Sequence, residues 1–82
     1  MYAIEQRKVV AVALEANAAL TNKDFNHGEI ILGLAELIGR VVVETADTSI
    51  QAAELMKVAM EHASRTIQIG AQARGKSQII GG

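Results

Sequence analysis

Residues 25–44 read FNHGEIILGLAELIGRVVVE, and they predict a helix that is apolar over more than half of its circumference. Asn26 is a favourable N-cap residue, and Glu29 stands three positions later, where its carboxylate can accept a hydrogen bond from the backbone N–H of the cap. Gly33 and Gly39 each cost about 1 kcal/mol against alanine in a helix interior, so they predict the close approach of another backbone. The apolar residues form two neighbouring stripes, Ile30, Leu34, Leu37 and Val41 in one and Ile31, Ile38 and Val42 in the other. Such a helix is expected at the centre of the fold, covered on several sides.

Two more helices are predicted around this central one, which we place at about residues 27–46. The first, at about residues 3–20, repeats Val9, Ala13, Ala16 and Leu20 at helical spacing. The third, at about residues 48–74, starts with Thr48 and Gln51 at the spacing of a capping box and ends before Gly75. Its apolar stripe comprises Ala53, Met56, Met60, Ala63, Ile67 and Gly70. With a tail at 75–82, we predict a single all-α domain over residues 1–82.

The composition predicts that this domain forms an oligomer or binds a partner tightly. Half of the 82 residues are hydrophobic, and only 2% are aromatic. A domain of this size hides only about 60–65% of the surface that its unfolded chain exposes, so one small core cannot cover so many apolar residues. We therefore expect a three-helix chain whose helical bundle is completed by homo-oligomerisation, as a dimer or a larger closed assembly.

Length, charge and residue types exclude several classes of protein. A chain of 82 residues is too short for a doubly wound nucleotide-binding fold or a (β/α)₈ barrel. The lack of cysteine excludes disulfide scaffolds, thiolate metal sites and cysteine nucleophiles. A net charge of -1 gives no general attraction to nucleic acid or to an anionic membrane. No apolar run is long enough for a signal peptide or a membrane span, so we expect a soluble, cytoplasmic protein.

A third stripe on the last helix is the candidate interaction surface. Four residues, Leu55, Val58, His62 and Ile69, lie on this stripe, which a three-helix monomer would leave half exposed. Methionine adapts to irregular partners, so the pair Met56 and Met60 suits either a core or a binding surface. The predicted partner or oligomer interface comprises Leu55, Met56, Val58, Met60, Ile69, Ile79 and Ile80.

The sequence shows no arrangement of residues typical of an enzyme. His27 and His62 do not occur at metal-ligand spacing, and Glu61 and His62, as neighbours on a helix, point about 100° apart. No metal, cofactor or catalytic residue is predicted. The sequence instead favours a non-catalytic protein that binds and occludes a protein partner, as inhibitors, antiactivators and adaptors do. The short helical chain, without proline or cysteine, resembles in kind the accessory proteins that bacteriophages encode, which implies a phage-encoded protein of this type.

Residues 70–77, GAQARGKS, match the phosphate-loop pattern G-x-x-x-x-G-K-S. A true phosphate loop needs a strand before it and a helix after it, and only five residues follow Ser77. We therefore interpret the segment as a helix C-terminus. The basic residues near this terminus suggest an alternative function. In an oligomer where several copies converge, these residues would sequester a phosphate-bearing ligand such as a nucleotide. The residues of that candidate anion site are Arg65, Arg74, Lys76 and Ser77.

A helix-turn-helix DNA-binding protein is the remote alternative. Ala35 and Gly39 have the small-residue spacing found at the corner of that motif. The recognition helix would then begin at residues 41–44, VVVE, which is apolar and acidic where contacts with bases and phosphates are needed. The sequence therefore disfavours nucleic acid as a partner.

Overall fold

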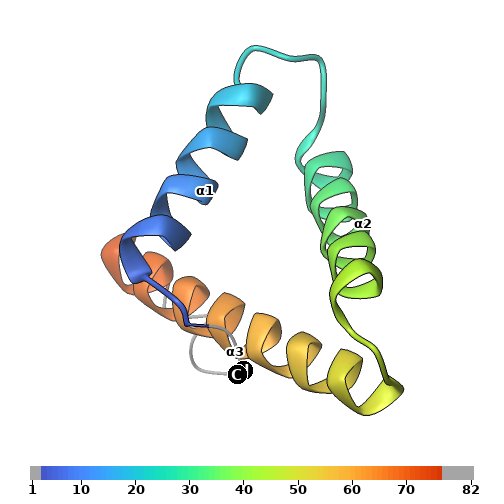
Figure 1. Ribbon diagram of the computed structural model, residues 1–82. Helices are drawn as coiled ribbons and strands as arrows, with labels where there is room; N and C mark the ends of the chain where they lie inside the picture. Colours follow the sequence, from blue (N-terminus) through green and yellow to red (C-terminus); the bar gives the residue numbers. More distant parts are fainter. Residues whose placement is uncertain (1–2, 77–82) are drawn as a thin grey trace. The chain divides into compact units, whose positions relative to one another are not determined.

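The computed structural model describes residues 3–76 and shows an all-α chain in that range, as the sequence predicts. Its helices are α1 (Gln6–Leu20), α2 (His27–Thr45) and α3 (Ser49–Ala73), which Figure 1 labels in chain order. The chain divides into two compact units, Met1–Glu36 and Leu37–Gly82, and the division falls within α2. Each unit is described separately below. The predicted pair Ile79 and Ile80 and the predicted anion ligand Ser77 lie outside the described residues.

Helix α1 begins at Gln6, three residues later than the sequence predicts. Glu5 stands at the N-cap in an extended conformation, and its side chain makes no capping hydrogen bond. Its carboxylate instead lies 3.3 Å from the Arg7 guanidinium and 3.9 Å from the Lys8 ammonium. Glutamate is not among the residues that cap helices well, so residues 3–5 gain little from joining the helix. At the other end the Thr21 hydroxyl donates to the carbonyl of Asn17 over 2.7 Å.

The capping box predicted at the start of α2 is confirmed. The backbone N–H of Asn26 donates to Glu29 Oε1 over 2.9 Å, and the backbone N–H of Glu29 donates to Asn26 Oδ1 over 2.8 Å. These two bonds satisfy N–H groups that would otherwise lack a partner at the helix end. The start of α2 is therefore fixed by four consecutive residues, without help from the rest of the chain.

Replacing Asn26 with alanine is expected to lower the free energy of unfolding by about 1 kcal/mol, because alanine offers no acceptor to the N–H of Glu29. Urea unfolding followed by circular dichroism, at one fixed protein concentration, measures the change. Asn26→Ser is the control, since its hydroxyl keeps an acceptor at the same place. An equal loss in both variants would show that the cap does not stabilise the protein.

Helix α3 begins and ends at the residues that the sequence indicates. Thr48 Oγ1 accepts the backbone N–H of Gln51 over 3.1 Å, and the Gln51 side chain accepts the backbone N–H of Asp47 over 2.7 Å. At the C-terminus Gly75 has a φ of +68°, the left-handed conformation that favours glycine. The N–H of Lys76 donates to Ala71 and that of Gly75 to Gln72, over 2.7 and 3.2 Å, which is the Schellman arrangement. The segment that matches the phosphate-loop pattern is thus a helix C-terminus as far as Lys76.

Few side chains are covered in either unit. Among the described residues, Ala71 alone is buried. In the first unit the half-buried residues are Val9, Ala16, Leu20 and Ile30. In the second unit they are Val42, Thr45, Ala46, Ala52, Leu55, Ala59 and His62. The central helix α2 is therefore apolar, as predicted, but most of its apolar side chains are not covered within the chain.

Candidate interaction surface

Exposed apolar side chains are the dominant surface feature of the described residues. They occur on all of the helices, and several are more than half exposed. Exposed apolar patches on a small protein are typical of binding surfaces, so these residues are the candidate interaction surface. The exposed large hydrophobic residues are Ile4, Val10, Val12, Leu14, Phe25, Ile31, Leu32, Leu34, Leu37, Ile38, Val41, Val43, Ile50, Met56, Val58, Met60, Ile67 and Ile69.

Helix α2 contributes most to this surface. At 100° per residue, both predicted stripes fall in one arc of about 140° that contains no charged residue. Leu32 and Val43 lie outside the arc and are the most exposed large hydrophobic residues described, at 72% and 78%. Apart from the neighbouring backbone of α2 itself, no atom of the described residues lies within 4 Å of the positions where a Cβ would stand on Gly33 or Gly39. The close backbone approach that these glycines predict is therefore not made within the chain.

The two stripes of α3 do not divide into one covered and one open stripe, since Val58 and Ile69 of the third stripe are 44% and 68% exposed. Leu55 and His62, on the stripe that was expected to stay half exposed, are half-buried together with Ala52 and Ala59. Met60 and Ile67, on the stripe that was expected to form the core, are 62% and 53% exposed. Helical periodicity shows that both stripes are apolar, but it does not show which of their residues the chain covers.

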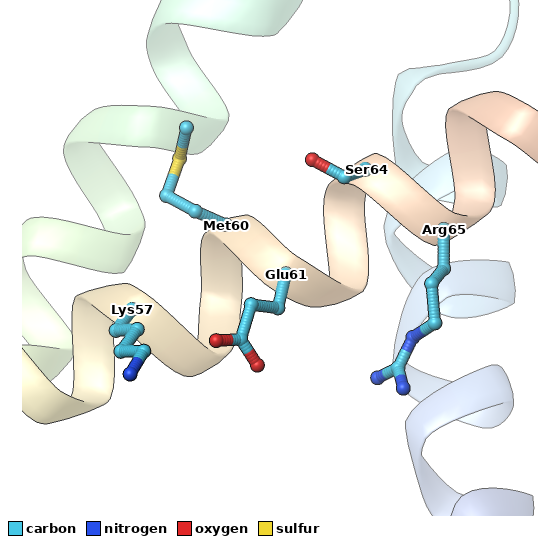
Figure 2. A pocket seen from close by; sticks show the side chains of 5 residues that line it. All are labelled: Lys57, Met60, Glu61, Ser64 and Arg65. Carbon is cyan, nitrogen blue, oxygen red and sulfur yellow. The ribbon is translucent and has the colours of Figure 1, made fainter. Parts of the chain in front are cut away.

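Shallow hollows lie on these surfaces in both units. The hollow on α3 is lined by Met60 and Ser64 and by the charged residues Lys57, Glu61 and Arg65. In Figure 2 the three charged side chains point to one side of α3, and Met60 and Ser64 point to the other. One hollow in the first unit is more apolar and was not predicted; it is lined by Leu20, Phe25, Glu29, Ile30, Gly33 and Leu34.

The candidate anion-binding residues do not converge within one chain. Arg65 and the C-cap residue Arg74 are nine residues apart, which places them on opposite sides of α3 and about 13 Å apart along its axis. The acidic Glu61 lines the same hollow as Arg65. The backbone N–H groups of Arg74, Gly75 and Lys76 all donate to carbonyls of the last turn of α3. A phosphate at this place would have to be bound by side chains, and Arg65 and Arg74 could contact the same phosphate only from different copies.

Within the described residues, no group of three or more His, Asp or Glu side chains is placed to hold a metal ion. None of the helices in residues 3–76 is long and apolar enough to span a membrane. Comparison with protein-family models, with curated proteins and with solved structures finds no match to this chain. Function therefore has to be inferred from the exposed surface.

Proposed function

We propose that this protein is a small, non-catalytic helical binding protein, which assembles with copies of itself and acts by binding and occluding a macromolecular partner. The observation that supports the proposal is the exposure of large apolar side chains on all three helices, while Ala71 is the one buried residue in the described range. Inhibitors, antiactivators and adaptors work in this way.

The physical basis of the proposal is that short helices need packing against other surfaces to be stable. Isolated helices of 12–15 residues or fewer are marginal in water, and most helices in proteins are stabilised by packing of an amphipathic face. Here α1 has 15 residues, and three of its apolar residues, Val10, Val12 and Leu14, are exposed. Fully burying a Val, Leu, Ile or Met side chain contributes roughly 1.5–3 kcal/mol. When another chain covers the apolar faces that stay exposed in one chain, their burial stabilises the helices.

The chemistry of these faces fits helix-on-helix recognition. The arc on α2 is built from branched aliphatic residues, with no charge to desolvate. Amphipathic helices that present such faces dock on other helices or in apolar grooves. The alternative is the sequestration of a nucleotide, which needs more than one copy if Arg65 and Arg74 are both to contact the ligand.

Size-exclusion chromatography with light scattering tests self-assembly. At micromolar concentration we expect a monodisperse species of at least twice the 8.7 kDa chain mass. A monodisperse species of 8.7 kDa would overturn this part of the proposal. Thermal-shift measurements with nucleotides separate the two functions, since a ligand at 100 times its Kd adds about 2.7 kcal/mol of stability. A shift of that size would favour nucleotide sequestration over occlusion of a macromolecule.

The occlusion of a partner is tested by affinity capture from the native cell. Wild-type protein is compared with Leu37→Glu, which alters the arc on α2, and with Leu32→Glu, which alters the opposite side. A protein captured by wild type and by Leu32→Glu, but lost with Leu37→Glu, supports the proposal. Recovery of the same proteins by all three baits would show that the arc does not bind them.

A further inference from the structure

We draw no further inference here: the strongest candidate, the apolar hollow of the first unit that Leu20, Phe25, Ile30 and Leu34 line where α1 leads into α2, is an open apolar surface, and nothing in the structure shows what covers it.

Discussion

Replacing Leu37 with glutamate is expected to dissociate the assembly and leave a monomer at concentrations where the wild type is oligomeric. Leu37 lies in the uncharged arc of α2 and is 55% exposed within the chain. In a monomer, a carboxylate at position 37 is hydrated. In an assembly that covers the arc, the carboxylate would be buried without a compensating polar group. The cost of such burial is at least several kcal/mol, which corresponds to a dissociation constant raised more than a hundredfold. Analytical ultracentrifugation over a range of concentrations measures this shift.

Leu32→Glu is the matched control for this experiment. It makes the same chemical change in the same helix, about 140° around the axis from Leu37 and outside the arc. Leu32 is 72% exposed, so a carboxylate there stays in water if only the arc is covered. We expect its oligomeric mass to equal that of the wild type. Equal effects of the two substitutions, or no effect of either, would show that the arc is not the covered face.

The midpoint of thermal unfolding is expected to rise by about 3–5 °C for each tenfold increase in protein concentration. A partner that binds only the folded state stabilises it by mass action. A tenfold increase in the concentration of that partner corresponds to about 1.4 kcal/mol in the free energy of unfolding. Circular dichroism at 222 nm, in cells of different path length, covers the required range. Leu37→Glu should unfold at a lower midpoint that does not change with concentration. A wild-type midpoint that is independent of concentration would mean that the chain is stable by itself.

The local features of the fold were predictable because each depends on a few adjacent residues. Asn26 with Glu29, and Thr48 with Gln51, form the predicted hydrogen bonds at the starts of α2 and α3. Gly75 adopts the left-handed conformation that closes α3. The start of α1 was placed too early, because apolar residues were counted where no capping residue is present. These motifs are local, so no knowledge of packing was needed to find them.

The coverage of each helix face could not be predicted from the same information. Helical spacing groups Met56 with Met60 and Leu55 with His62, but the burial of each pair depends on how a neighbouring helix approaches α3. The sequence placed α2 in a covered core because its arc is so apolar. Within the chain, Leu37, Ile38 and Val41 of that arc remain exposed. The excess of apolar residues in the composition is the signal from which we propose that an additional chain covers these faces.

The turn that closes α3 decides which kind of ligand can approach this part of the molecule. In a phosphate loop, several unused amide hydrogens surround the ligand at the positive end of a helix dipole. Here the amide hydrogens of residues 74–76 are already engaged, and the end of α3 is the negative pole. An oxyanion placed there would find no unused backbone N–H in residues 74–76 and could be held only by the side chains of Arg74 and Lys76. The sequence pattern of a phosphate loop therefore does not create a backbone anion site when it stands at the C-terminal end of a helix.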